Sequence, residues 1–252
     1  MSTTTISIPL RDAALFLDLD GTLAEIAERP VDVRPVPART VLLNELKQAL
    51  DGRLAVVSGR PIEDIDWILG GVVTCVAGVH GLEHRDATGR FSSPPPLPRL
   101  LEAYPEVEKF VRSCSGLHLE YKNLSLSIHY RQVPALANDV ITFARQLAWS
   151  TGLKLLQGRM VVELRSPGAD KGDAIRRFMK EPLFRGKTPI FVGDDMTDED
   201  GFAAVKDLSG FGVLVGPRRE TSAKARIGSV GQVHLWLSTS ISMKRFELDL
   251  LA

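Results

Sequence analysis

Short apolar runs alternate with helix-patterned segments in the first third of the chain, and few folds accommodate that order. The runs are residues 13–17, 54–57 and 72–77, which are short and typical of buried parallel strands. Between them, apolar residues recur at helical spacing over residues 37–50 and 62–69. The alternation predicts an α/β fold, with a doubly wound parallel sheet covered by helices on both faces.

The pattern changes after the proline-rich segment 92–96. Residues 124–130 alternate apolar and polar side chains, which is the period of a sheet with one open face. Further helices are predicted at residues 100–113 and 135–151, and further strands at residues 154–156 and 160–164. This middle stretch therefore predicts a small separate α+β unit.

Beyond Pro167 the parallel pattern resumes. A helix is predicted at residues 171–179, and strands are predicted at residues 189–192, 212–215 and 233–237. We therefore expect a core made of residues 1–84 and 166–252, interrupted by an inserted α+β unit at residues 85–165.

Charge and hydropathy limit the possible partners. The 252 residues include 31 Lys and Arg and 31 Asp and Glu, for a formal net charge of zero. This balance argues against a general nucleic-acid or anionic-membrane surface. No segment reaches the roughly 18 consecutive apolar residues of a membrane span, and the start of the chain does not resemble a secretory signal. We expect a cytoplasmic monomer without nucleic-acid or membrane partners.

Polar residues follow three of the predicted strands at the point where each strand ends. They are Asp18 and Asp20, Ser58 and Arg60, and Asp194 and Asp195. Ligands of open parallel sheets bind outside the carboxyl ends of the strands, so these groups are predicted to share one crevice. Carboxylates held together repel one another unless a cation neutralises them, and an oxygen-rich cluster suits Mg²⁺.

At these residues the chain resembles a known superfamily. The segment Asp18-Leu19-Asp20-Gly21-Thr22-Leu23 resembles the D-x-D-x-T-L signature of the haloacid dehalogenase (HAD) phosphohydrolases. Ser58 resembles their second motif, Lys171 their third, and Gly193-Asp194-Asp195 their fourth, in the expected order. The resemblance implies a HAD-type core whose inserted unit is a cap.

The resemblance also implies a role for each motif residue. Asp18 would be the nucleophile on phosphorus, and Asp20 would protonate the leaving group and then activate water. Mg²⁺ would be held by the Asp18 carboxylate, the Asp20 backbone carbonyl and Asp194. The implied phosphate-binding residues are Ser58, Gly59 and Lys171, and the implied supporting residues behind the metal are Asp195 and Asp198.

A narrower resemblance covers the chain from about Ala14 to Leu237. Segments 58–60, 77–83 and 193–200 together resemble trehalose-6-phosphate phosphatases, and segments 120–122, 127–131 and 163–167 resemble the sugar-facing cap motifs of that family. The implied reaction is hydrolysis of trehalose 6-phosphate, the last step of trehalose biosynthesis. The implied substrate-binding residues are Arg60, His80, Glu120, Lys122, His129, Arg131 and Glu163.

The sequence also allows other interpretations of the substrate and of Asp198. The chain departs from the family pattern at Leu19, where an aromatic residue is frequent, and at Asp170, where asparagine is frequent. Related caps bind other sugars, so the substrate could be sucrose phosphate or mannosylglycerate phosphate, and a silent sugar-phosphate sensor is a further alternative. Asp198 fits either a metal-supporting group or the charged first turn of a helix, whereas Glu199 fits the helix turn.

Overall fold

The computed structural model describes residues 4–250, which divide into two compact units. The first unit runs to Ser93 and resumes at Ala169, and the second unit spans Pro94–Gly168. The sequence-based insertion, residues 85–165, begins earlier than the structural one. The reason is that the chain makes two short antiparallel strands on the large sheet before it enters the second unit.

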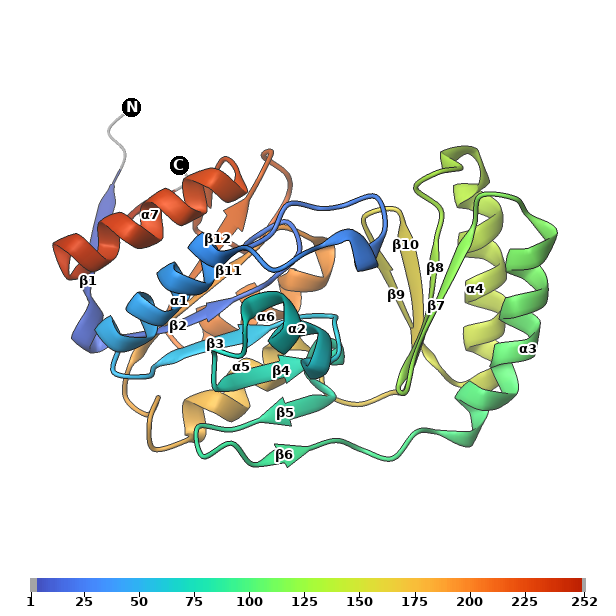
Figure 1. The fold of residues 1–252 in the computed structure, drawn as a ribbon, viewed down its shortest axis with the longest axis horizontal. Helices are drawn as coiled ribbons and strands as arrows, with labels where there is room; N and C mark the ends of the chain where they lie inside the picture. Colours follow the sequence, from blue (N-terminus) through green and yellow to red (C-terminus); the bar gives the residue numbers. More distant parts are fainter. Residues whose placement is uncertain (1–3, 251–252) are drawn as a thin grey trace. The chain divides into compact units, whose positions relative to one another are not determined.

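An eight-stranded sheet forms the centre of the first unit (Figure 1). Its order is β13 (Ala225–Ile227), β12 (Phe211–Val215), β11 (Thr188–Gly193), β2 (Ala13–Leu17), β3 (Leu54–Val57), β4 (Cys75–Gly78), β5 (Glu83–Arg85) and β6 (Phe91–Ser92). Strands β13 to β4 pair in parallel, and β5 and β6 pair antiparallel at one edge. The predicted α/β fold with a parallel sheet is confirmed.

Helices cover both faces of this sheet, as predicted. On one face lie α1 (Pro37–Ala49), α2 (Ile62–Leu69) and α7 (Val230–Met243), and on the other lie α5 (Lys171–Lys180) and α6 (Glu199–Asp207). Each set contributes buried apolar side chains to a separate core layer. Strand β2 is buried along its whole length between the two layers, which explains its uninterrupted apolar run.

The prediction of a strand at residues 233–237 is wrong, because this segment lies within helix α7. Val233 and Leu237 are four residues apart and both face the core, which is helical spacing that a short apolar run does not separate from a strand. The edge of the sheet is β13 instead. The chain ends also pair, since β1 (Thr5–Pro9) lies antiparallel to β14 (Arg245–Asp249).

The second unit is an antiparallel sheet with two helices on one face. The strand order is β7 (His118–Lys122), β8 (Ser125–His129), β10 (Val161–Arg165) and β9 (Lys154–Gly158). Helices α3 (Pro98–Ser113) and α4 (Ala137–Thr151) bury the apolar face of this sheet, including Leu126, Ile128 and Leu164. The alternation along residues 124–130 therefore reflects one covered face and one polar face, as predicted.

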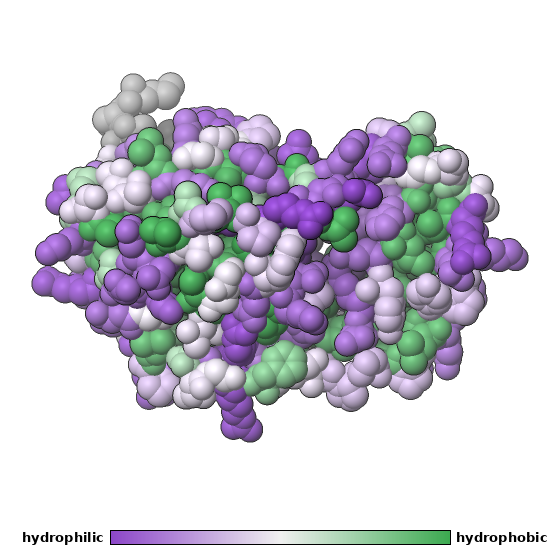
Figure 2. Space-filling model, viewed as in Figure 1, coloured by the Kyte–Doolittle hydropathy of each residue, from purple (hydrophilic) through white to green (hydrophobic). Residues whose placement is uncertain are grey.

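Short 3-10 helices link these elements. They are η1 (Leu10–Asp12), η2 (Pro30–Asp32), η3 (Val79–Gly81), η4 (Pro134–Leu136) and η5 (Met196–Asp198). Hydrophilic residues are interspersed with apolar ones over the surface seen in Figure 2. Within residues 4–250, none of the helices has the length and apolar character that crossing a membrane requires.

Candidate active site

Asp18 is the first residue after strand β2, and the fold places it at the carboxyl end of the parallel sheet. Its backbone N–H donates to the carbonyl oxygen of Val192 on β11 at 2.9 Å, which continues the strand pairing into the loop. The side chain is buried. Burial raises the pKa of the Asp18 carboxyl to about 7, although the neighbouring Lys171 ammonium lowers it.

Lys171 begins helix α5 and its ammonium lies between two carboxylates. Its Nζ donates to Asp18 Oδ1 at 2.8 Å and to Asp198 Oδ1 at 2.6 Å. Burial by itself lowers the pKa of the Lys171 ammonium, but the two carboxylates outweigh it and raise that pKa above its ordinary value. A capping box at Asp170 and Asp173 fixes the start of the helix, and so fixes where the lysine projects.

A tight acidic loop follows strand β11. Asp198 is fully buried, and its Oδ2 accepts the backbone N–H groups of Asp194 and Asp195, both at 2.9 Å. Burial raises the pKa of the Asp194 carboxyl to about 9, with further increases from Asp18, Asp198 and Asp195. The Asp195 side chain accepts the Met196 N–H at 2.6 Å.

Asp18, Asp194 and Asp198 form a carboxylate cluster that fits a hard cation. Each offers one oxygen, and these oxygens lie within 4.8 Å of one another. Oxygen donors of this kind are the ones that Mg²⁺ and Ca²⁺ take in proteins. The site is also crowded, because a Cβ on Gly21, whose φ is +85°, would lie 2.2 Å from Asp194 Oδ2.

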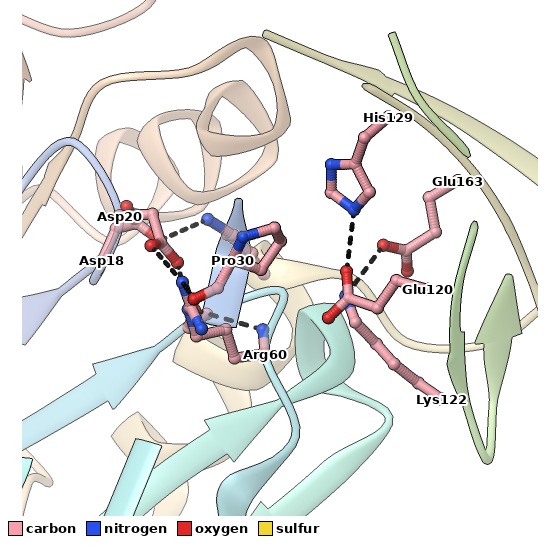
Figure 3. A network of polar contacts seen from close by, with 10 residues as sticks. Asp18, Asp20, Pro30, Arg60, Glu120, Lys122, His129 and Glu163 are labelled. Atoms are coloured by element: carbon pink, nitrogen blue, oxygen red, sulfur yellow. Dashed lines mark hydrogen bonds and ion pairs between the residues drawn. The ribbon is translucent and has the colours of Figure 1, made fainter. Parts of the chain in front are cut away.

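The Asp20 carboxylate is not a member of this cluster. Figure 3 shows it against the guanidinium of Arg60, whose Nε donates to Asp20 Oδ2 at 2.6 Å and whose Nη2 donates to Oδ1 at 2.7 Å. Nη2 also donates to the carbonyl oxygen of Pro30 at 3.0 Å. Arg60 therefore binds the loop that follows β2, at Asp20 and again at Pro30.

The second motif is shaped by close packing around Ser58 and Gly59. The Ser58 hydroxyl accepts the backbone N–H of Arg60 at 3.2 Å, and the Ser58 carbonyl accepts the N–H of His80 at 2.9 Å. A Cβ on Gly59 would lie 2.5 Å from Nε2 of His80, so only glycine leaves room for the imidazole. His80 itself has a φ of +54°, a sparsely populated conformation for a residue with a side chain.

The polar face of the second unit carries a separate network, also drawn in Figure 3. Lys122 Nζ lies 3.6 Å from Glu120 Oε2 and 3.5 Å from Glu163 Oε2. The Glu120 carboxylate also meets the His129 imidazole at 2.9 Å. Burial raises the pKa of Glu120, but the hydrogen bond from His129 and the Lys122 charge outweigh it and leave that pKa below the ordinary value.

Arg131, also on the second unit, donates from Nη2 to the carbonyl oxygen of Arg159 at 3.2 Å. Strand pairing brings Glu120 and Glu163 together, because Ser127 is the register partner of both. The Ser127 hydroxyl donates to Glu163 Oε2 at 3.0 Å. Ser127 is not among the predicted substrate-binding residues, although the alternation of β8 places it on the same face as His129.

The structure thus gathers the predicted residues in two groups. In the first unit, the strand ends bring together Asp18, Asp20, Ser58, Gly59, Arg60, His80, Lys171, Asp194, Asp195 and Asp198. In the second unit, one sheet face brings together Glu120, Lys122, His129 and Glu163. Arg219, which is not among the predicted site residues, donates to the Asp195 carbonyl at 2.8 Å.

Solved structures define the class to which this fold belongs. The C-terminal domain of the trehalose-6-phosphate phosphatase of Candida albicans superposes with a TM-score of 0.82 and covers 92% of each chain at 20% identity. A haloacid dehalogenase-like hydrolase from Bacillus subtilis superposes with a TM-score of 0.63 at 16% identity, covering 89% of this chain and 99% of its own. These likenesses establish the fold, which is that of the HAD phosphatases.

Sequence comparisons define the family. A family model described as trehalose-phosphatase matches residues 16–230. The trehalose-6-phosphate phosphatase of Escherichia coli (strain K12) is 38% identical over 241 residues, which cover 92% of this chain and 89% of that relative. A probable trehalose-phosphate phosphatase of Sinorhizobium fredii is 34% identical and covers 89% of this chain and 85% of its own length. The chain belongs to the trehalose-phosphatase family, whose members are phosphoric monoester hydrolases of the HAD superfamily.

Proposed function

We propose that this protein hydrolyses trehalose 6-phosphate to trehalose and inorganic phosphate, as a cytoplasmic monomer. The observation that carries the proposal is the position of Asp18 at the end of β2, with Lys171 Nζ 2.8 Å from its Oδ1 and two further carboxylates within reach of a shared cation. Phosphoryl transfer to a carboxylate requires an oxygen nucleophile, a cationic group that balances the phosphoryl charge, and carboxylates that bind a metal ion.

In the first step, an oxygen of Asp18 attacks the phosphorus. The bond from phosphorus to the sugar oxygen breaks, an aspartyl phosphate forms, and the departing sugar oxygen takes a proton from the Asp20 carboxyl. Lys171, Ser58 and Gly59 hold the phosphoryl oxygens. The two hydrogen bonds from Arg60 fix where the Asp20 carboxyl lies, so Arg60 orients the proposed acid.

In the second step, Asp20 takes a proton from water while the water oxygen attacks the phosphorus. The bond from phosphorus to Asp18 breaks, which restores both carboxyl groups and releases inorganic phosphate. Mg²⁺, held by Asp18, Asp194 and the Asp20 carbonyl with Asp195 and Asp198 behind them, would supply charge stabilisation to the phosphoryl group. Burial is the largest cause of the raised pKa of the Asp194 carboxyl, and the neighbouring carboxylates add a repulsion that a bound cation would relieve.

Specificity is proposed for the cap, residues 85–165 in the sequence-based division, with residues 1–84 and 166–252 as the catalytic core. The polar sheet face carries Glu120, Lys122, His129 and Glu163, a dense set of charged donors and acceptors. Sugar hydroxyls need such partners in a shielded site. Arg131, and in the core Arg60 and His80, are further candidates for substrate contact.

Phosphate release from trehalose 6-phosphate, compared with glucose 6-phosphate and sucrose 6-phosphate, tests this function. Each substrate is assayed with Mg²⁺ and with a chelator. A metal-dependent preference for trehalose 6-phosphate is the expected result. A preference for sucrose 6-phosphate would transfer the proposal to another sugar phosphate, and binding of trehalose 6-phosphate without any release would identify a sensor instead of an enzyme.

A further inference from the structure

Arg219 links two neighbouring loops of the first unit. One loop follows β11 and carries Asp194 and Asp198, and the other follows β12, the next strand of the sheet. Arg219, in the second loop, donates from Nη2 to the main-chain carbonyl of Asp195 at 2.8 Å. Its Nη1 donates to the Glu199 carboxylate and to the carbonyl of Glu220, the latter at 3.0 Å.

Glu199 makes this tie rigid. Its Oε1 accepts the hydroxyl of Thr221 at 2.8 Å as well as the Arg219 guanidinium, and its Oε2 accepts the N–H of Ser222 at 2.8 Å. The interpretation of Glu199 as only a charged first helical turn therefore misses its contacts. A guanidinium that engages a carboxylate and a carbonyl at once is fixed in both direction and distance.

The acidic loop is thus held from two sides. From within, Asp198 Oδ2 accepts the N–H groups of Asp194 and Asp195. From outside, Arg219 binds the carbonyl of Asp195, which also accepts the N–H of Asp198 at 3.1 Å. With the loop held in this way, one carboxylate oxygen each of Asp18, Asp194 and Asp198 lies within 4.8 Å of the others, despite the repulsion between like charges.

We propose that Arg219 is a positioning residue that holds the Asp194 loop in the geometry the divalent cation needs. The proposal rests on the metal site of the proposed function. Arg219 acts through the Asp195 peptide and does not itself touch cation or substrate. Groups behind the first ligands of a metal typically account for about 10- to 100-fold in metal affinity. The expected signature of Arg219 is therefore weaker metal binding, with near-normal catalysis once metal is saturating.

Arg218 provides a matched control. It carries the same charge on the adjacent residue, is exposed, and makes no hydrogen bond or ion pair within residues 4–250. Removing Arg218 changes the local charge as much as removing Arg219 but breaks no tie. A difference between the two variants therefore isolates the tether from the general electrostatic field of the loop.

The experiment compares wild type, Arg219→Ala and Arg218→Ala, with Mg²⁺ as the only added ligand. Isothermal titration calorimetry gives the Mg²⁺ Kd, and thermal unfolding with and without Mg²⁺ gives an independent measure of the same binding. We expect Arg219→Ala to weaken Kd by about tenfold and to reduce the Mg²⁺-induced rise in Tm, whereas Arg218→Ala matches wild type. Phosphate release at saturating Mg²⁺ should then approach the wild-type rate.

Equal Kd values for all three proteins would overturn the proposal, even if Arg219→Ala had a lower Tm without metal. An equal weakening in both variants would overturn it too, because charge alone would then account for the effect. Should Arg219→Ala fail to fold, Arg219→Gln carries the same comparison, since its amide fills part of the space. A wild type that binds Mg²⁺ without hydrolysing trehalose 6-phosphate defeats the proposed function and leaves this comparison intact.

Discussion

Arg60 donates two parallel hydrogen bonds to the carboxylate of Asp20, from Nε to Oδ2 at 2.6 Å and from Nη2 to Oδ1 at 2.7 Å. This fork-to-carboxylate geometry is among the strongest side-chain pairings in proteins. The cluster of Asp18, Asp194 and Asp198 does not include this carboxylate. Arg60 therefore orients the carboxyl that is proposed as the acid.

Substitution of Arg60 should lower turnover through Asp20. We expect Arg60→Ala to reduce kcat by about 10²-fold, because a misplaced acid group by itself costs that much. Asp20→Asn should cost about 10²- to 10⁴-fold, the usual contribution of general acid–base catalysis. The double variant decides the mechanism: if both residues act as one unit, it is no slower than Asp20→Asn, whereas fully additive losses would show that Arg60 acts elsewhere.

Replacement of the nucleophile should abolish the reaction. Asp18→Asn is expected to lower kcat by several orders of magnitude, and the protein should no longer incorporate label from radiolabelled substrate phosphate. The fold should persist, since Lys171 keeps its 2.6 Å contact with Asp198. Asp12→Asn, on the exposed η1 turn, serves as the control. Full phosphate release by Asp18→Asn would rule out the assignment.

The two raised carboxyl pKa values make stability depend on pH. Burial is the main cause that raises the pKa of the Asp18 carboxyl from 3.8 to about 7 in the folded chain, and that of the Asp194 carboxyl from 3.8 to about 9. Between those values the folded state binds more protons than the unfolded state, so without metal the free energy of unfolding should fall as pH rises from about 4 to about 9. Below about pH 4 the contribution is complete.

Mg²⁺ should offset this fall in the free energy of unfolding at high pH, because it binds the deprotonated carboxylates. Thermal unfolding with and without Mg²⁺, at about pH 6 and about pH 8.5, measures the difference. We expect the Mg²⁺-induced rise in Tm to be larger at the higher pH, and smaller in Asp194→Asn at both. A rise in Tm that does not change with pH would show that these carboxyls are not the groups that the metal meets.

Gly21 should resist substitution for two separable reasons. An alanine Cβ there meets Asp194 Oδ2 at 2.2 Å, and the backbone φ of +85° is unfavourable for any side chain. Gly71 has a similar φ of +67° but open space around its Cβ position, so Gly71→Ala isolates the backbone strain, about 1 to 2 kcal/mol. We expect Gly21→Ala to lose more stability than that and also Mg²⁺ affinity, as measured by denaturant unfolding and calorimetry. Equal effects of both substitutions would contradict the crowding.

Glu163 should affect substrate choice more than chemistry. Its carboxylate accepts the Ser127 hydroxyl at 3.0 Å and lies 3.5 Å from Lys122 Nζ. We expect Glu163→Gln to lower kcat/KM for trehalose 6-phosphate by about 10- to 100-fold, the usual value of a charged hydrogen bond. Hydrolysis of p-nitrophenyl phosphate, which lacks the sugar, should be unchanged. Glu108→Gln, on the outer helix α3, is the control, and a parallel loss on both substrates would assign Glu163 to stability instead.

Strand-end positions were predictable because buried parallel strands appear in the sequence as short, uninterrupted apolar runs. The run at residues 13–17 is uniformly apolar since β2 is covered on both faces, and Asp18 follows it abruptly. Helix α7 was mistaken for a strand because its apolar residues at 233–237 fit either period. Strands β5 and β6 gave no signal, since three- and two-residue edge strands lack room for a pattern.

Within the site, the sequence predicted which residues meet but not how their side chains turn. Asp20 was expected at the strand end, yet its engagement by Arg60 depends on rotamers that no spacing encodes. Asp198 was left open between two roles, and the structure places its carboxylate in contact with Lys171 and two loop amides. Arg219 lies in a charged surface run, where nothing separates a tethering arginine from its solvated neighbour.

The contact between Lys171 and Asp18 joins residues 153 positions apart, and Asp198 lies a further 27 positions along the chain. A ribosome adds about 5 to 20 residues each second, so the nucleophile emerges about 10 to 40 seconds before its partners exist. Strand β2 likewise waits for β11 as its second neighbour. The nascent chain therefore stays chemically inert through most of its synthesis and acquires its reactive centre only as the last third of the polypeptide folds.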